Sequence, residues 1–317
     1  MKTSVIICGY TLVRLEDMHE AVNAALSQTI RPHEVVVAVD HNEELFDRLK
    51  VELPSEVKLV LSQGTPGLSE TRNVAVNSTE GDVIAFLDDD AVPEEDWIEN
   101  LIVPFDDPKI MAVGGRAIPQ WPKGKPPFWF PVDLDFMIGC TTHKELILQA
   151  SGEIRNVTGS NMAFRKEVFE RVGLWDTKLG RCEMGRVRFN PSGGEEAELC
   201  LRIKNYIPDG MIVYRPEAIV HHKVTPERTK LKYSFNYAFR EGVTRVMMKK
   251  IVSRYGHQPL AAENLFLRRL LLVSIPKRLV RFYRLTPVAQ IVVLLIDLFL
   301  IAAGYVLGMW QYRKGGF

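Results

Sequence analysis

The sequence predicts an α/β protein, with a mostly parallel sheet flanked by helices, followed by a C-terminal helical segment associated with a membrane. One observation predicts the α/β part. Short β-branched runs alternate with helical patterns through the first two thirds of the chain, and such alternation favours a doubly wound, parallel sheet. A second observation predicts the C-terminal part, because residues 288–310 are almost entirely apolar.

The expected strands and helices of the first part follow one another closely. Apolar β-branched runs predict strands at residues 4–8, 34–40, 57–62 and 82–88, and apolar residues at helical spacing predict helices at 15–26 and 68–77. In parallel sheets, ligands bind beyond the carboxyl ends of the strands. Asp40 ends the second expected strand, and Asp88, Asp89 and Asp90 end the fourth, so these carboxylates are candidate site residues.

A loop rich in proline and aromatic residues separates this part from the next elements. Residues 119–131 contain five prolines and four large aromatic residues and are predicted to be irregular. A strand and a helix are expected within residues 161–172, then a helix that begins at Glu195 and a strand at 211–220. We expect residues 1–225 to form one catalytic domain.

Beyond residue 225 the chain changes character. Residues 226–287 are predicted to be a basic amphipathic helical segment suited to anionic headgroups. The 23 residues at 288–310 would span roughly 34 Å as a helix, enough for a hydrocarbon core of about 30 Å. Asp297 in mid-span opposes a spanning helix, because a carboxylate there costs about 2.5–3.5 kcal/mol. A transmembrane helix, a re-entrant or in-plane hairpin and the core helix of a soluble dimer stay open.

The charge of the chain is balanced only as a whole. Its 317 residues include 40 Lys and Arg, 39 Asp and Glu and 46% apolar residues, which excludes disordered and collagen-like chains. Residues 1–220 carry 23 basic and 35 acidic side chains, a charge of −12, whereas residues 221–317 carry 17 and 4, a charge of +13. We therefore expect an acidic body and a basic tail that favours an anionic membrane surface, with no nucleic-acid partner.

The N-terminus and the cysteines predict the compartment of the body. The apolar run at residues 5–8 is too short for a signal peptide, and no small-residue cleavage site follows it. The cysteines show no metal-ligand or redox spacing, which predicts free thiols in a reducing compartment; they are Cys8, Cys140, Cys182 and Cys200. We expect the catalytic body at the cell membrane on its cytoplasmic side.

The aspartates at the end of the fourth strand predict a metal site. Three adjacent carboxylates repel one another, so they ionise together most readily when a cation neutralises them. Oxygen ligands without a nearby cysteine favour Mg²⁺ or Mn²⁺. One of His221 and His222 is a further candidate ligand, because strand alternation turns only one of them toward a given side.

A second acidic cluster opens the helix expected at Glu195. Gly193 and Gly194 precede Glu195 and Glu196, and glycines permit a close approach of substrate or backbone. A carboxylate at this position is a candidate general base. Acidic residues also favour a helix N-terminus through the helix dipole alone, so the pattern by itself leaves both interpretations open.

Taken in chain order, eight motifs resemble those of family 2 glycosyltransferases, which have the Rossmann-like GT-A fold. The resemblance covers about residues 3–225, and with the apolar tail the sequence is most similar to archaeal glucosyl-dolichyl-phosphate glucuronosyltransferases. The motifs are residues 4–11, 36–42, 67–73, 86–90, 159–165, 173–176 and 194–196, and His222.

The resemblance implies a nucleotide site. Asp40 corresponds to the aspartate that contacts the nucleotide base, although His41 replaces the second Asp of the usual Asp-Asp-Gly-Ser run. Arg72, within Thr-Arg-Asn, corresponds to an arginine of the nucleotide site.

The resemblance also implies a metal site and a base. Asp88 and Asp90 correspond to the outer residues of the Asp-X-Asp motif, with Asp90 as the direct metal ligand, and His222 to a histidine near the metal and diphosphate. Glu196 stands where the family has its catalytic Asp, so we expect Glu196 to be the base and retain Glu195 as the alternative.

The implied activity is a metal-dependent, inverting hexosyl transfer. A sugar would move from a nucleotide-sugar donor, expected to be a UDP-sugar, to a hydroxyl of a glycan linked to polyprenyl or dolichyl phosphate. An alternative is a polyprenyl-phosphate sugar synthase, whose acceptor is the lipid phosphate and needs no strong base. A sugar nucleotidyltransferase would need a Gly-rich basic loop where residues 9–14 read Gly-Tyr-Thr-Leu-Val-Arg. The sequence makes no prediction of oligomeric state.

Overall fold

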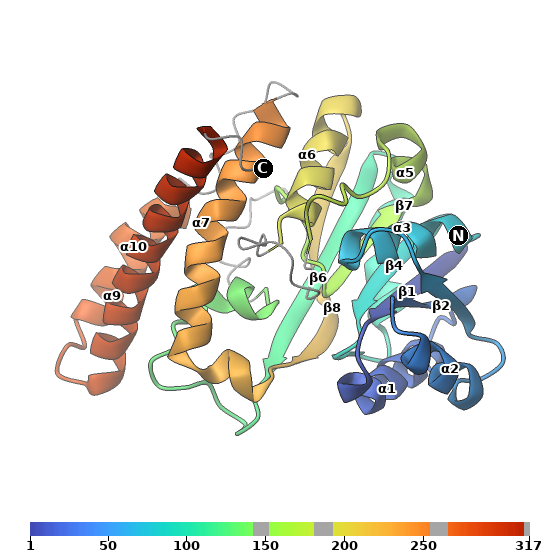
Figure 1. Cartoon of the computed structure of the whole chain (residues 1–317), viewed down its shortest axis with the longest axis horizontal. Helices are drawn as coiled ribbons and strands as arrows, with labels where there is room; N and C mark the ends of the chain where they lie inside the picture. The colour runs from blue at the N-terminus through green and yellow to red at the C-terminus, as the bar shows by residue number, and fades with distance from the viewer. Residues whose placement is uncertain (142–151, 181–192, 254–265, 314–317) are drawn as a thin grey trace.

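The computed structural model describes residues 1–141, 152–180, 193–253 and 266–313. Within these residues an eight-stranded mixed sheet has the order β3-β2-β1-β4-β7-β6-β8-β5. Helices cover both faces of the sheet, and the C-terminal helices stand beside it (Figure 1). The strands are β1 (Thr3–Gly9), β2 (Glu34–Asp40), β3 (Lys58–Ser62), β4 (Val83–Asp88), β5 (Ala91–Pro93), β6 (Ile110–Gln120), β7 (Asn161–Arg165) and β8 (Met211–Lys223).

The helices follow the expected pattern with short turns between them. The α-helices are α1 (Leu15–Leu26), α2 (Glu43–Glu52), α3 (Leu68–Ser78), α4 (Trp97–Ile102), α5 (Lys166–Val172), α6 (Glu195–Tyr206), α7 (Leu231–Ser253), α9 (Ile275–Leu279) and α10 (Leu285–Arg313). Short helical turns are η1 (Leu12–Arg14), η2 (Val103–Asp106), η3 (Val132–Ile138), η5 (Pro226–Thr229) and the π-helical η6 (Leu270–Ser274).

The predicted α/β class is confirmed. The N-terminal half of the sheet is parallel, and in the other half β6 and β8 also pair in parallel. β1 pairs in parallel with β2 and β4, and β2 with β3. β7 then pairs antiparallel with both β4 and β6, which makes the whole sheet mixed. β6 was not expected from the sequence, because Gly114, Gly115 and Pro119 interrupt its apolar pattern.

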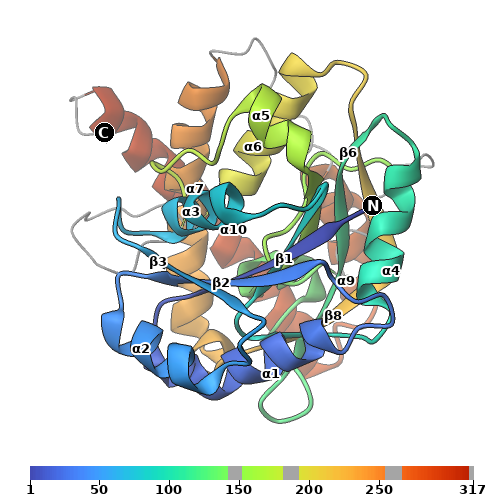
Figure 2. The ribbon, with the colours of Figure 1, turned by 90° about the vertical axis from the view of Figure 1, so that its right-hand side faces the viewer.

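The strands at the centre of the sheet are buried on both faces, which explains their continuous apolar runs. Alternation along β1 sends Val5 and Ile7 into one core and Ile6 into the other. Helices α1, α2 and α4 cover the first core, whereas α3, α5 and α6 cover the second (Figure 2). This arrangement leaves the carboxyl ends of β1, β2 and β4 free to carry a site.

The proline-rich loop joins the C-terminal helices to the sheet domain. Trp129 and Phe130 of this loop pack with Ile138 of η3 and with Val293 of α10. A neighbouring cluster joins η3 to α7, η6 and α10. The described cysteines Cys8, Cys140 and Cys200 are free thiols, and Cys182 lies outside the described residues.

Candidate functional site

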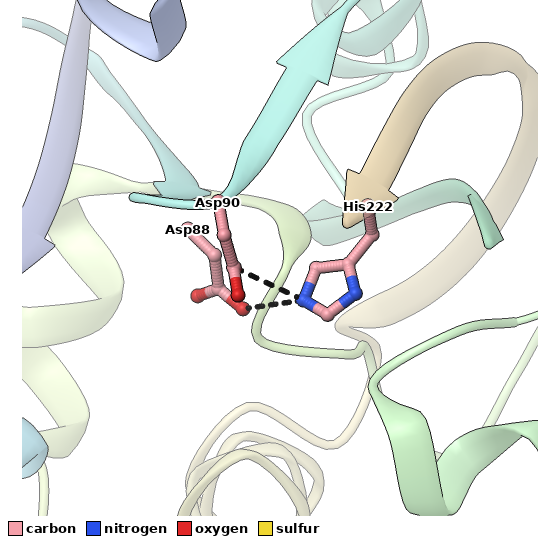
Figure 3. A group of neighbouring side chains, drawn as sticks. All are labelled: Asp88, Asp90 and His222. Carbon is pink, nitrogen blue, oxygen red and sulfur yellow. Dashed lines mark ion pairs between the residues drawn. The ribbon is translucent and has the colours of Figure 1, made fainter. Parts of the chain in front are cut away.

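Two aspartates and one histidine meet at the end of β4 (Figure 3). His222 Nε2 lies 3.2 Å from Asp90 Oδ1 and 3.5 Å from Asp88 Oδ2. One ligand atom from each of the three residues lies within 4.8 Å of the others. The short strand β5 explains the meeting, because it follows Asp90 directly and its Ala91 pairs with His222 on β8.

The donor set of this triad fits a divalent cation. Its two carboxylates offer the oxygen ligands that suit Mn²⁺ or Mg²⁺, and the imidazole offers one nitrogen ligand. The side chains of Asp90 and His222 are 2% and 1% exposed, whereas that of Asp88 is 32% exposed. Gly139 makes room for the ring, because a Cβ there would lie only 3.1 Å from His222 Cε1. The triad is therefore buried at Asp90 and His222 and open to solvent at Asp88.

The charges of the triad are strongly coupled. Burial lowers the pKa of His222, but the negative charge of Asp90 and hydrogen bonds to both carboxylates outweigh it and raise this pKa well above its ordinary value. Burial likewise raises the pKa of Asp90, yet His222 and Arg14 hold it below its usual range. An imidazolium at His222 would offset part of the negative charge of the two carboxylates, and a cation that the ring ligated would displace its proton.

The middle aspartate of the run turns to a different partner. Arg14 Nη1, from η1, lies 2.7 Å from Asp89 Oδ1 and 3.1 Å from Asp90 Oδ2. Burial raises the pKa of Asp89 to about 7, although Arg14 opposes the shift. Arg14 was not predicted as a site residue. Its contacts give it a positioning role, because it holds the loop that carries Asp90.

A buried arginine gathers the two glutamates at the start of α6. Arg72 Nη1 lies 3.2 Å from Glu195 Oε1 and 3.3 Å from Glu196 Oε1. The guanidinium also lies over the ring of Trp175, 5.2 Å from its centroid. The side chains of Arg72 and Glu195 are each 3% exposed, whereas that of Glu196 is 17% exposed. Of the two glutamates, Glu196 therefore offers the accessible carboxylate.

Gly159 creates the space for this ion pair. A Cβ at Gly159 would lie 2.6 Å from Arg72 Nη2 and would collide with Glu196 Oε1. The φ angle of Gly159 is not in the positive range, so steric space and not backbone freedom requires glycine here. The sequence pattern placed Gly159 in a motif without indicating this role.

Asp40 lies at the same strand edge but is already hydrogen-bonded. Its Oδ2 accepts the backbone N–H of Gly67 at 3.0 Å, and its Oδ1 lies 2.7 Å from His41 Nδ1. His41 adopts a positive φ of 49°, and its other ring nitrogen lies 3.0 Å from the carbonyl of Gly64. Asp40 thus fixes the turn that precedes α3, the helix that carries Arg72.

Several carboxylates of the site lie close enough to Cys8 to affect the pKa of its thiol. Burial raises the pKa of this thiol to about 12, with Arg72 opposing the shift and Asp88, Asp89 and Asp40 adding to it. Cys8 pairs with Asp88 across β1 and β4. The structure therefore brings Asp40, Arg72 and the triad to one edge of the sheet, as expected for the carboxyl ends of parallel strands. His221, in contrast, faces away and pairs with Glu94 at 3.1 Å.

Known proteins resemble the chain in sequence over three quarters of its length or more. It is 33% identical over 320 residues to the glucosyl-dolichyl phosphate glucuronosyltransferase of Haloferax volcanii, covering 98% of this chain and 96% of that protein. It is 26% identical over 243 residues to the succinoglycan biosynthesis protein ExoM of Rhizobium meliloti, covering 75% of this chain and 72% of that protein.

Solved structures with low sequence identity share the fold. The mannosyltransferase PcManGT of Pyrobaculum calidifontis, in complex with GDP-Man and Mn²⁺, superposes with a TM-score of 0.59 at 17% identity, covering 99% of this chain and 83% of that chain. The glucosyl-3-phosphoglycerate synthase of Mycobacterium tuberculosis, in complex with Mn²⁺, UDP and glucosyl-3-phosphoglycerate, superposes with a TM-score of 0.52 at 12% identity, covering 80% of each chain.

The family assignment follows from the extent of these matches. The sequence model described as Glycosyl transferase family 2 matches residues 4–173, which is more than half of the chain. The matched segment contains β1 to β4, the Asp88–Asp90 run and Arg72. The chain therefore belongs to glycosyl transferase family 2 and has the GT-A fold.

Proposed function

We propose that the chain transfers a sugar from a nucleotide-sugar, a UDP-sugar, to a hydroxyl of a glycan carried on dolichyl or polyprenyl phosphate. The Haloferax relative is named for an activity on glucosyl-dolichyl phosphate and matches this chain through its C-terminal helices. UDP or a GDP-sugar, with Mn²⁺, is bound in the solved structures of similar fold. These likenesses support a nucleotide-activated donor and a lipid-linked acceptor.

The position of Glu196 is the observation that supports a hydroxyl group as the acceptor. Its carboxylate is partly exposed at the N-terminus of α6 and is held by Arg72. A sugar hydroxyl must lose a proton as it attacks, and a positioned carboxylate accepts that proton. A lipid phosphate is already ionised and needs no such base. The exposed glutamate therefore favours transfer to a hydroxyl over a polyprenyl-phosphate sugar synthase.

The remaining site residues receive supporting roles. Asp88, Asp90 and His222 would hold Mn²⁺ or Mg²⁺, and a bound cation would stabilise negative charge on the departing diphosphate. Asp40 would lie next to the nucleotide base. Arg72 would orient Glu196, because its buried Nη1 contacts the carboxylates of both Glu195 and Glu196.

The reaction we propose is a single displacement at the anomeric carbon. Glu196 accepts the proton of the acceptor hydroxyl while the hydroxyl oxygen forms the new glycosidic bond. The bond from the anomeric carbon to the diphosphate oxygen breaks on the opposite side, and the diphosphate leaves with the electron pair. One displacement inverts the anomeric centre. Glu195, which is buried, remains in place as a positioning residue.

The C-terminal helices support association with a membrane. One helix, Leu285–Gln311, is long and apolar enough to cross a bilayer, by length and composition, among the residues that the structure describes. A lipid-linked acceptor would be presented at such a surface. We propose that the catalytic domain lies on its cytoplasmic side.

The test is product analysis with two acceptors and two matched variants. Purified chain with Mn²⁺ and a set of UDP-, GDP- and dTDP-sugars is offered dolichyl phosphate or glucosyl-dolichyl phosphate. We expect extension of the glycosylated lipid with inversion, abolished by Glu196→Gln with nucleotide binding retained, and by EDTA. Glu195→Gln is the matched control and should retain measurable transfer. Transfer to dolichyl phosphate alone, or full activity of Glu196→Gln, would contradict the proposal.

A further inference from the structure

The outer face of α10 is a continuous apolar stripe. Phe299 is 72% exposed and Val306 is 68% exposed. Most of the exposed apolar residues of α10 are three or four positions apart, as on one helix face, when the exposed Ala302 is counted between Phe299 and Val306; they are Val288, Val292, Leu295, Phe299, Val306 and Trp310. A contiguous apolar surface of this kind marks an interaction with a protein or a membrane.

The opposite face of α10 packs closely along α7. Asp297 is 1% exposed, and its Oδ2 accepts the hydroxyl of Ser234 at 2.8 Å. A Cβ on Gly242 of α7 or on Gly304 of α10 would collide with a backbone carbonyl of the facing helix. Gly308 continues the contact one turn later. The two backbones therefore run together, and the only acidic residue of α10 faces the protein.

The far side of α7 belongs to the catalytic body. A Cβ on Gly194, which precedes α6, would lie 3.1 Å from Thr244 Cγ2 of α7. The hydroxyl of Tyr233 donates to the carbonyl of Met137 in η3 at 3.0 Å. α7 thus stands between α10 and α6 (Figure 1), and the first turn of α6 contains Glu196. Its charged residues are Lys232, Arg240, Glu241, Arg245, Lys249 and Lys250.

These contacts limit the orientation that α10 can adopt in a lipid bilayer. If α10 crossed the bilayer, the charged middle of α7 and the start of α6 would lie at the depth of the hydrocarbon, because they are packed beside it. Charged side chains are strongly disfavoured there. We propose that α10 lies in the plane of the membrane surface, with its apolar stripe in the lipid and α7 with the catalytic body above it. The inference rests on the membrane association proposed above.

The charge of the segment identifies the lipid surface. Residues 266–313 contain seven basic residues and one acidic residue, the buried Asp297. The turn between α9 and α10 exposes Phe282 and Tyr283, which are 70% and 69% exposed, beside the exposed Arg281 and Arg284. Aromatic and basic residues side by side are typical of an interfacial anchor for anionic headgroups. The apolar stripe of α10 therefore contacts the surface of an anionic membrane leaflet.

The first experiment measures the sidedness of the two ends. The full chain carries one tag at the N-terminus and a different one at the C-terminus, and protease is added to sealed right-side-out and inside-out membrane vesicles. The in-plane orientation predicts digestion of both tags in the same preparation. Digestion of the two tags in opposite preparations would show that α10 crosses the bilayer and would overturn the proposal. Detergent controls confirm that each tag is cleavable.

The second experiment measures the binding of the chain to lipid vesicles, which does not depend on enzymatic activity, and so tests whether lipid covers the stripe. The full chain is floated with phosphatidylcholine vesicles with or without phosphatidylglycerol. We expect stronger binding with the anionic lipid, a loss of about fivefold for each of Arg281→Gln and Arg284→Gln, and a loss of at least about tenfold for Phe299→Glu. Val51→Glu, at a residue of α2 that is 85% exposed, is the matched control and should bind normally.

An alternative occupant would give a different pattern. If Phe299→Glu binds vesicles normally but converts a dimer to a monomer in light scattering, a second copy of the chain covers the stripe and the lipid proposal is wrong. Failure of sugar transfer in the wild-type chain would not affect either experiment, so the proposed function and the in-plane orientation can fail separately.

Discussion

Replacing Gly159 by alanine tests whether the Arg72–Glu196 geometry controls catalysis. The added Cβ would lie 2.6 Å from Arg72 Nη2, and ordinary contacts begin at 3.4 Å. The guanidinium must therefore move by about 0.8 Å and Glu196 Oε1, which lies closer to the added Cβ, by more; a misplacement near 1 Å can reduce a rate by about 10²-fold. Because alanine can adopt the backbone conformation, the free energy of unfolding should fall only by the about 1–3 kcal/mol typical of overpacking.

The assay is sugar transfer at saturating donor, together with nucleotide binding and urea denaturation. We expect kcat to fall by about 30- to 100-fold, a larger factor than any weakening of nucleoside diphosphate binding through the displaced Arg72. In the double variant Gly159→Ala/Glu196→Gln the second change should add little to the loss caused by Glu196→Gln, because both act on one carboxylate. Wild-type kcat in Gly159→Ala, or fully additive losses, would refute the reasoning.

Three further predictions concern the cation, the loop and the helix pair. If His222 ligates Mn²⁺ as proposed, the cation displaces a proton from a group whose pKa is raised. Titration calorimetry should then show affinity rising about tenfold per pH unit below that pKa, and His222→Ala should flatten this slope. Arg278 Nη2 lies 2.6 Å from Asp133 Oδ2, and the two side chains are only 15% and 9% exposed. Arg278→Met should therefore lower the free energy of unfolding by up to about 3 kcal/mol, and Asp133→Asn in the same chain should restore part of this loss. An unchanged urea midpoint in Arg278→Met would show that the ion pair is not needed for stability. Gly304→Leu should lower Tm through the collision with α7, whereas Ala302→Leu on the exposed side should not, and equal Tm values for both would contradict the close helix contact.

Much of the site could be predicted from strand ends. Asp40 and Asp88 are polar residues that end apolar runs, and the rule for parallel sheets places them at one edge. Arg14 and Gly159 could not be predicted in this way. Their roles depend on which side chains lie within a few ångström in the folded chain, and no local pattern contains that information. The mixed half of the sheet was missed for a related reason, because β6 is held by pairing with β7 and β8 despite its glycines.

The sequence by itself determined the α/β class, the acidic run after β4 and the apolar C-terminal helix, since each depends on local periodicity and composition. Only the tertiary structure decided which partners these features have. The pairing of β5 with β8 places His222 against Asp90, and the burial of Glu195 leaves Glu196 as the accessible carboxylate. The packing of α10 on α7 likewise gives the apolar helix one outer face instead of an apolar surface all round. Contacts between residues distant in the chain are set by the way the elements pack, which composition and spacing do not encode.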